Sequence, residues 1–235
     1  PWQLPLPSPT EFTCPDQNLN KLRQRALRTL HLCMHEHYED CPWREQALYT
    51  YDSRSQMLNG YYAWGNYDFA AASLDIWRYS QRDDGHLRIY APSRSETVIP
   101  VYSLIWPIQI YEHWLYSGQI DVFLRNQEAV DKLFANVTKN RDPETGLCVE
   151  SSSNFWHFYE WASGLSDRKC PAGEIHALYN LYMIEALKAY IALKKAVGKT
   201  ASQYTQMICD LRTATEALFY SPVTRAYASK YHNGN

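Results

Sequence analysis

Residues 35–54 bring acidic, basic and aromatic side chains together in the sequence HEHYEDCPWREQALYTYDSR. Carboxylic acids can donate protons, and arginines and carboxylates can hold hydroxyl groups through charge-assisted hydrogen bonds. Aromatic rings suit carbohydrate, because the faces of a sugar ring are apolar while its edges carry hydroxyls. The stretch therefore indicates a sugar pocket that can perform acid chemistry. Its candidate residues are Asp40, Arg44, Glu45, Tyr49 and Asp52.

The same side chains could instead serve structure alone. A network of helix caps and salt bridges at a junction between two helices uses the same residue types. His31 and His35 lie four residues apart and could share a metal ion, but the chain lacks the HExxH pattern that places a glutamate between two ligating histidines. We therefore expect hydrogen-bonded or solvated histidines, no metal and no cofactor.

A second concentration of aromatic residues and acids lies at residues 154–161, in the sequence NFWHFYEW. It falls within residues 148–173, the longest segment without a helical pattern. Long loops in compact domains are usually functional or disordered, and a loop rich in aromatic residues is rarely disordered. Trp156 and Trp161 are candidates for stacking on sugar, although the loop could equally fold these rings into a small core of its own.

Helical periodicity dominates the rest of the chain, and no convincing alternating strand is present. The first helix is predicted to begin at the cap Asn18 and to bury Leu19, Leu22, Ala26, Leu30, Cys33 and His37. The fourth contains Pro107, where it either kinks or begins, and it ends at Gly118. The other helices are predicted over about residues 51–64, 66–84, 120–137, 174–197 and 202–218.

These elements predict an all-α fold of helix pairs, arranged as a ring of α-hairpins. About seven helices are counted, and the seventh has no eighth to pair with, so we expect a six-hairpin (α/α)6 toroid that is truncated within its architecture. Residues 1–17 carry four prolines in the first nine positions, which predicts an extended linker from an upstream domain. Residues 18–235 are then the N-terminal portion of the toroid.

Composition excludes some functions. The net charge of −2 gives no basic surface for nucleic acid, and no apolar run is long enough for a spanning helix. No signal peptide is recognisable, which leaves the compartment open; a full-length precursor could be periplasmic or extracellular. The six cysteines, which form no CxxC pair, predict neither a zinc site nor a dense disulfide framework.

The run CMHEHYEDCPWREQALYTYDSR resembles the catalytic-domain signature of the bacterial α-L-rhamnosidases of glycoside hydrolase family 78. In that signature an Asp-Cys-Pro segment leads through Arg and Glu to an Asp seven residues beyond the Glu. These positions fall here on Asp40, Arg44, Glu45 and Asp52. The run IPVYSLIWPIQIYEHWLYSG and the aromatic loop that ends at Trp161 are also similar to the family. The resemblance covers roughly residues 18–220.

The resemblance implies an (α/α)6 barrel that hydrolyses terminal α-L-rhamnose with inversion of configuration. It implies Glu45 as general acid, with Asp40, Arg44 and Asp52 holding sugar hydroxyls, and a general base beyond this chain. The expected partners are a rhamnose-containing oligosaccharide, polysaccharide or glycoside and the upstream and downstream segments of the same enzyme, with no nucleic acid or membrane. The 235 residues alone would then bind sugar and hydrolyse almost nothing.

Two departures from the signature leave alternatives open. The family commonly has Trp four residues after the acid and Gly just before the last Asp, where this chain has Tyr49 and Tyr51. Both changes keep an aromatic wall but reshape it, which affects sugar preference. The alternatives are an (α/α)6 glycosidase of different specificity and a non-catalytic α-toroid that binds carbohydrate.

Overall fold

The computed structural model describes residues 4–150, 152, 154–168 and 174–232. The helices in these residues are α1 (Gln17–Leu32), α2 (Thr50–Trp64), α3 (Tyr67–Ile76), α4 (Pro100–Ser117), α5 (Asp121–Val137), α6 (Ala177–Ala196) and α7 (Gln203–Phe219), with a 3-10 turn, η1 (Trp77–Ser80), after α3. The strands are β1 (His157–Phe158), β2 (Ser166–Asp167), β3 (Glu174–His176), β4 (Tyr220–Ser221), β5 (Ala226–Tyr227) and β6 (Lys230–His232). The prediction of a mainly helical chain with about seven helices is confirmed.

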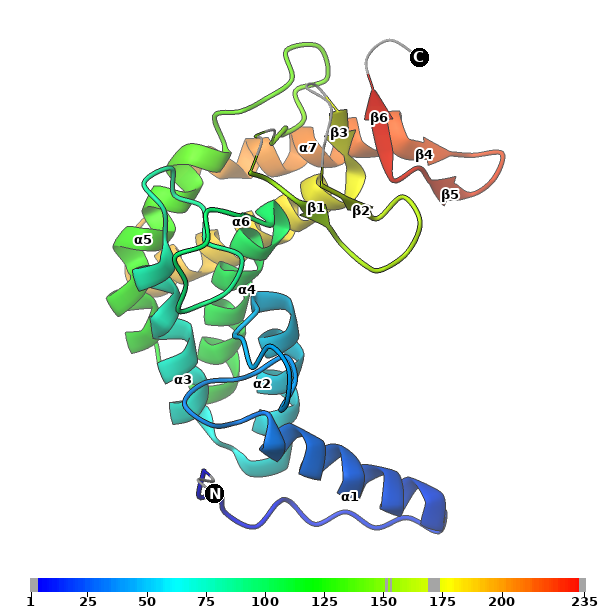
Figure 1. Cartoon of the computed structure of the whole chain (residues 1–235). Helices are drawn as coiled ribbons and strands as arrows, with labels where there is room; N and C mark the ends of the chain where they lie inside the picture. The colour runs from blue at the N-terminus through cyan, green and yellow to red at the C-terminus, as the bar shows by residue number, and fades with distance from the viewer. Residues whose placement is uncertain (1–3, 151, 153, 169–173, 233–235) are drawn as a thin grey trace.

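The helices form an open arc of two layers (Figure 1). Helices α2, α4 and α6 follow one another along the inside of the arc, and α4 packs against both α2 and α6. Helices α3, α5 and α7 form the outer layer, where α3 and α5 cover α4 and α7 covers α6. This alternation is what helix pairs joined by short and long loops produce, as the sequence pattern predicted.

Helix α4 is the centre of the core. Pro100 occupies its first turn, where a missing N–H costs no hydrogen bond, and Gly118 ends it with a φ of 73°. Pro107 lies inside the helix, so of the two alternatives the start of the helix at Pro107 is excluded. The helix is apolar on most sides, and Trp106 is fully buried with its indole N–H donating to the carbonyl of Leu74 at 3.1 Å. A helix buried on most sides can be covered by both layers.

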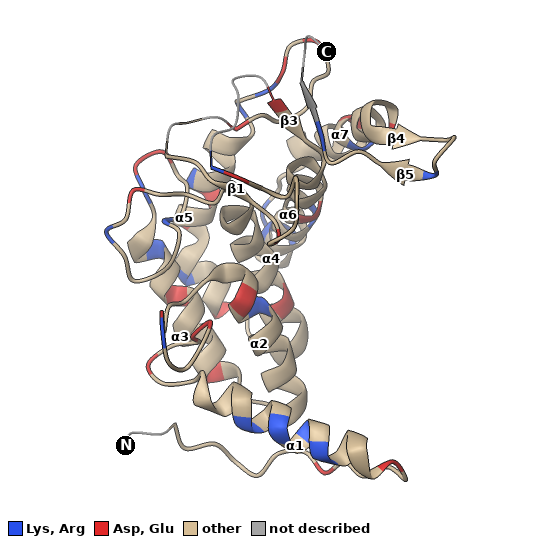
Figure 2. Cartoon of the chain, turned by 45° about the vertical axis from the view of Figure 1, so that its right-hand side comes forward, with Lys and Arg blue, Asp and Glu red and all other residues tan. Residues whose placement is uncertain are grey.

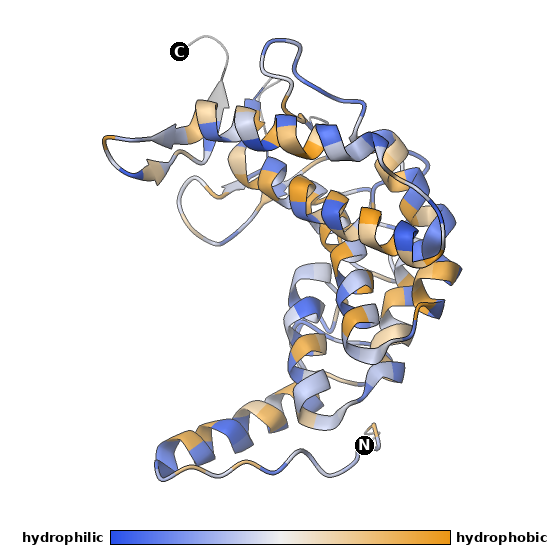
Figure 3. Ribbon diagram, turned by 180° about the vertical axis from the view of Figure 1, so that it is seen from behind, coloured by the Kyte–Doolittle hydropathy of each residue, from blue (hydrophilic) through white to orange (hydrophobic). Residues whose placement is uncertain are grey.

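The expected core face of the first helix is wrong for the residues within α1, whereas Cys33, directly after the helix, is buried as expected. Asp16, two residues before the predicted cap Asn18, caps α1 by accepting a hydrogen bond from the backbone N–H of Asn18 at 2.8 Å. No residue of α1 is buried, and the Leu22 side chain is 63% exposed. In Figure 3 hydrophobic and hydrophilic residues alternate along this exposed helix, and Figure 2 shows its Lys and Arg residues. Periodicity identifies a face that can be buried, but not the neighbour that would cover it.

The short strands were not predicted. Residues 157–158 pair with 166–167, residues 220–221 pair with 226–227, and β3 pairs with β6. Because β3 includes Glu174, the sixth helix begins three residues later than predicted, at Ala177. The segment after α7 therefore returns to the body of the protein, bringing Lys230 beside His176 in the strand register. Strands of two or three residues have too few positions for an alternating pattern to be visible in the sequence.

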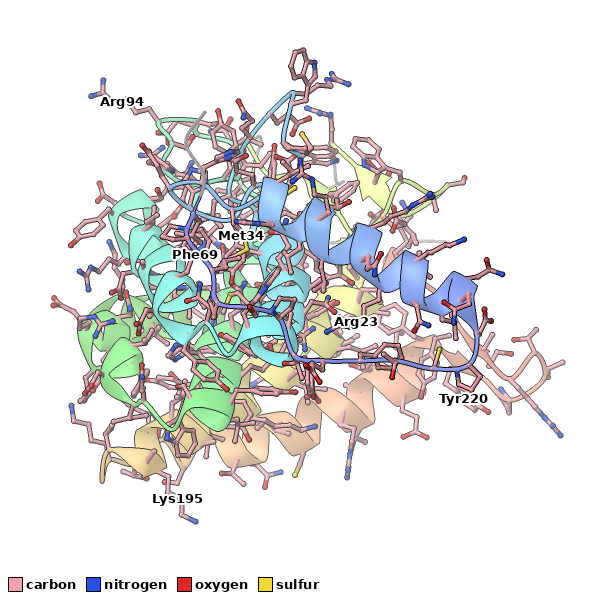
Figure 4. The ribbon with its side chains drawn as sticks, turned by 90° about the horizontal axis from the view of Figure 1, so that it is seen from below. Arg23, Met34, Phe69, Arg94, Lys195 and Tyr220 are labelled. Carbon is pink, nitrogen blue, oxygen red and sulfur yellow. The ribbon has the colours of Figure 1, made fainter. Side chains whose placement is uncertain are left out.

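The N-terminal residues from Leu4 onward run alongside α1 (Figures 1 and 4). The backbone N–H of Thr10 donates to the carbonyl of Ala63 at 2.7 Å, and the Arg23 guanidinium donates to the carbonyl of Thr10. His31 Nε2 lies 2.8 Å from the carbonyl oxygen of Leu4. The segment is extended, as its prolines predicted, and its origin in an upstream domain stays a prediction.

Three further expectations concern the presence of a metal site, the state of the cysteines and the presence of a membrane-spanning helix. Across the described ranges, no three His, Cys, Asp or Glu side chains are grouped to hold a metal ion. The described cysteines are free, with Cys33 and Cys148 buried and Cys209 exposed, while Cys170 lies outside the described residues. None of the helices traced in the described residues combines the length and apolarity needed to span a bilayer.

Candidate active site

The candidate site begins in the loop between α1 and α2. Hydrogen bonds of Asp40 hold the two ends of a turn in this loop together. The backbone N–H of Asp40 donates to the carbonyl of Ala47 at 3.0 Å, and its Oδ1 accepts the N–H of Ala47 at 2.9 Å. The two bonds fold residues 41–46 into a projecting turn in which Gln46 has a φ of 50°. Asp40 thus has a structural role, and one of its carboxylate oxygens is already engaged.

Glu45 projects from this turn. It is exposed, and its Oε2 accepts a hydrogen bond from the Tyr49 hydroxyl at 2.9 Å. Tyr49 is the residue that precedes the first turn of α2, so the start of this helix fixes the phenol relative to the acid. Burial raises the pKa of Tyr49, and its bond to Glu45 raises it further, so the phenol stays a donor. Glu45 Oε1 has no such restraint among the described residues.

Asp52 lies in the first turn of α2 and is half-buried. Burial raises the pKa of Asp52, and the negative charges of Asp40 and Glu45 raise it further, while its own backbone N–H acts in the opposite direction. Asp52 therefore interacts electrostatically with both Asp40 and Glu45. The structure brings together the acids that the sequence analysis selected.

The two arginines of the stretch differ. Arg44 is exposed in the turn and forms no ion pair within the described part of the chain. Arg54 is instead held by Glu112 of α4, with Nη2 at 2.5 Å from Oε1 and Nε at 2.9 Å from Oε2. Arg54 thus ties the two inner helices together, whereas Arg44 is available to a ligand.

Tyr102 connects this region to the second aromatic stretch, and sequence analysis missed it. The residue lies in the first turn of α4, and its ring centroid is 6.2 Å from that of Tyr51 and 6.3 Å from that of Tyr49. On its other side is Phe158 of β1, at 6.5 Å. Burial raises the pKa of Tyr102, and the charges of Asp52 and Glu160 add to this. Helix α4, which looks like ordinary core in the sequence, therefore supplies the central ring of an aromatic wall formed by Tyr49, Tyr51, Tyr102 and Phe158.

The two predicted tryptophans have different environments. Trp156 is 9% exposed, and its indole N–H donates to Ser166 Oγ at 3.2 Å. The guanidinium of Arg168 lies over its ring at 4.0 Å. Trp161 is 76% exposed and its ring is 4.8 Å from that of Phe158. Trp156 therefore belongs to the main hydrophobic core and not to a separate core of the loop, whereas Trp161 presents an open face.

A cavity of about 130 Å³ lies between the two stretches. Tyr51, Tyr102, Phe158, Glu160 and Tyr182 are among its lining residues. Glu160 was not predicted as a site residue, although the motif ending Glu160-Trp161 could have indicated it. A larger cavity of about 700 Å³ lies between the N-terminal segment, α1 and α2, and its lining includes Asp40 but not Glu45. The smaller cavity has the aromatic and acidic lining that suits a sugar, but its lining includes none of the predicted site residues Asp40, Arg44, Glu45, Tyr49, Asp52, Trp156 and Trp161.

The family described as the bacterial alpha-L-rhamnosidase 6 hairpin glycosidase domain matches residues 8–235. No curated protein matches the chain in sequence. Among solved structures, the chain is similar to a glycoside hydrolase family 78 rhamnosidase of Bacillus sp. GL1, with 25% identity and a TM-score of 0.88 over 98% of this chain and 24% of that chain. A rhamnosidase from Klebsiella oxytoca with rhamnose bound gives 21% identity and a TM-score of 0.80, over 95% and 43% of the two chains.

A third structure, the Streptomyces avermitilis α-L-rhamnosidase complexed with L-rhamnose, gives 18% identity and a TM-score of 0.73, over 92% of this chain and 20% of that chain. The helix arc is thus that of a six-hairpin glycosidase domain. The chain belongs to the bacterial α-L-rhamnosidase six-hairpin glycosidase domain family, and it spans about a quarter of the length of the Bacillus relative.

Proposed function

We propose that this chain carries the acid half of an inverting α-L-rhamnosidase active site, with Glu45 as the general acid. The observation that carries the proposal is the position of Glu45: it is exposed at the end of a turn closed by Asp40 and hydrogen-bonded to Tyr49. The family membership supports terminal α-L-rhamnose as the sugar, because related structures contain bound rhamnose.

In the proposed reaction Glu45 gives its proton to the glycosidic oxygen as the bond between that oxygen and the anomeric carbon breaks. Water forms the new bond from the opposite face of the sugar ring, so the configuration inverts, and a general base takes the proton of this water. Because inverting enzymes place acid and base ~6.5 to 9.5 Å apart, the base belongs to a segment on the far side of the sugar. We assign it to residues outside this chain.

The other residues position the sugar in this proposal. Arg44 and Asp52 hold ring hydroxyls, Asp40 contributes its remaining oxygen, and Tyr49 orients the acid. Trp161 packs on an apolar sugar face, supported by Trp156 from behind. The exposure of Arg44 and Trp161 supports their roles, since each has donors or ring surface available to a ligand.

One observation favours a second candidate, a six-hairpin glycosidase for a different sugar. Tyr51 lines the cavity, its ring stacks on that of Tyr102 with planes 13° apart, and its hydroxyl lies 3.4 Å from that of Tyr182. A phenol at a position where the resembling enzymes commonly have glycine changes both the width and the hydrogen bonding of the cavity.

The test uses the enzyme polypeptide that contains this chain and an aryl α-L-rhamnoside. Glu45→Gln is expected to lower kcat by about 10² to 10⁴, because general acid catalysis contributes that much. Glu36→Gln, which changes a nearby exposed glutamate, is the matched control and is expected to retain activity. NMR of the first product should show the inverted anomer.

Unchanged kcat in Glu45→Gln would reject the acid assignment. Cleavage of another aryl glycoside but not the rhamnoside would favour the second candidate. Sugar binding without turnover of any glycoside would instead leave a carbohydrate-binding toroid.

A further inference from the structure

Behind the aromatic wall lies a buried group of ionisable side chains that the proposed chemistry does not use. Each is less than 9% exposed: His86, Glu150, His157, Glu174, His176 and Tyr179. Burying so many polar groups is costly unless they have partners or stay neutral. Their position at one end of α6, directly behind the hairpin β1–β2, suggests a role in holding that hairpin.

The centre of the group is a pair of stacked imidazoles. His157 of β1 and His176 of β3 have ring centroids 4.4 Å apart and planes 19° apart. Successive side chains of a strand point to opposite faces. Phe158 accordingly packs towards Tyr102 and the cavity, while His157 faces away from it, towards the start of α6. The stack therefore fixes the side of the hairpin that lies opposite the sugar wall.

Charged and titratable groups of the described elements β2, β3, β6 and α6 and of the loop before β1 lie around the pair. His176 Nε2 lies 2.9 Å from Glu174 Oε1 on β3. Lys230 of β6 lies 2.7 Å from Asp167 of β2 and 3.6 Å from Glu174. From the loop before β1, Glu150 accepts from Tyr179 of α6 at 3.3 Å and lies 3.4 Å from His86, and the Tyr159 ring is 5.7 Å from that of His176.

Burial lowers the pKa of His157 to about 4, and the neighbouring His176 adds to the shift. Burial also lowers the pKa of His176 to about 4, with Lys230 acting in the same direction. Glu150 and Glu174 oppose the shift at His157, and Asp167 opposes it at His176, but burial is the larger effect at each ring. Both rings are therefore neutral near pH 7, and stacking does not place two cations side by side.

We propose that His157 and His176 are a positioning pair: their neutral stack holds hairpin β1–β2, with Phe158, Glu160 and Trp161, against the sugar cavity, and protonation of the pair releases the hairpin. Two imidazolium rings at this separation would repel each other inside a poorly solvated space. The role in sugar binding rests on the proposed function, whereas the release of the hairpin does not.

The deciding variant is His157→Phe, which keeps a flat ring but cannot take a proton. In the unmodified enzyme KM for the aryl rhamnoside is expected to rise at least about fivefold between pH 6.5 and 4, with a smaller change in kcat. His157→Phe should hold the change in KM within about twofold. His157→Ala, which removes the ring, should raise KM already at pH 7. His113→Phe, which changes a buried histidine of α4, is the control and should keep the unmodified profile.

A second readout needs neither sugar nor turnover. Acrylamide quenching of Trp156, which is 9% exposed beside β1, taken as the difference from Trp156→Phe, should increase on acidification in the unmodified protein and much less in His157→Phe. This separates the two proposals: if no glycoside is cleaved but the quenching behaves as stated, the pair is supported and the proposed function is rejected. If His157→Phe retains the full acid dependence of both KM and quenching, the positioning pair is wrong. His157→Ala can fail to fold without affecting this comparison.

Discussion

The hydroxyl of Tyr49 donates to Glu45 Oε2 at 2.9 Å, which links the residue that caps the start of α2 to the exposed acid. The bond restricts a side chain that is otherwise free in solvent, and in the proposed function it leaves Oε1 to protonate the leaving group. It also explains how tyrosine can serve where the resembling enzymes commonly have tryptophan: the ring remains, and a donor is added.

Tyr49→Phe tests this relationship. The ring contacts with Tyr90 and Tyr102 would remain, but the donor would be lost. We expect kcat on the aryl rhamnoside to fall about tenfold, because an incorrectly oriented acid protonates the leaving oxygen less often, while KM changes little. Tyr62→Phe, which removes an exposed hydroxyl bonded to Tyr116, is the matched control. Equal kcat in both variants would show that the bond does not orient the acid.

Asp52→Asn tests the shared acidic environment. A carboxyl whose pKa is raised in the folded state binds protons more readily when folded, so its ionisation removes stability as pH rises from its ordinary value near 3.8 through the raised value. The free energy of unfolding of Asp52→Asn should therefore improve relative to the unmodified protein over that interval and then level off. Denaturant titrations from pH 3 to 7 measure the difference. A difference independent of pH would contradict the raised pKa, whatever the effect on sugar binding.

Arg54 and Glu112 are predicted to act in stability and not in catalysis. Glu112→Gln leaves the half-buried guanidinium without its carboxylate, and the loss should cost about 1–3 kcal/mol in the free energy of unfolding. Arg54→Met combined with Glu112→Met should recover part of that cost, because no unpaired charge remains. Thermal unfolding measures both, and KM for the rhamnoside should change less than about twofold. A large increase in KM would place Arg54 among the sugar ligands.

Changing each of the two tryptophans of the aromatic loop to alanine should have different effects on stability and on KM. Trp161→Ala removes an exposed ring, so stability should change within about 0.5 kcal/mol while KM rises several-fold. Trp156→Ala removes a buried ring and should cost about 3 kcal/mol or more, with loss of sugar binding as a consequence. Unfolding curves and KM together test this. Similar stability losses in both variants would mean that Trp161 is also structural.

The sequence by itself determined the helices and the acidic turn. Apolar residues at helical spacing define most of the helices, and a cap or a glycine ends several of them, as Gly118 does for α4. The acids Asp40, Glu45 and Asp52 could be found because they lie within thirteen consecutive residues and carry a recognisable spacing. Candidate site residues can be recognised from the sequence when they are neighbours in the chain.

Only the tertiary structure decided what those elements face. Tyr102 looks like one more apolar position in a buried helix, yet α4 places it between Tyr51 and Phe158, which are more than one hundred residues apart. The same holds for the stack of His157 on His176, which depends on two strands too short to predict. Leu22 is the opposite case: it lies on an apolar helical face that was expected to be buried, yet it remains exposed. Periodicity records which side of a segment is apolar, but only packing between distant segments decides its neighbours.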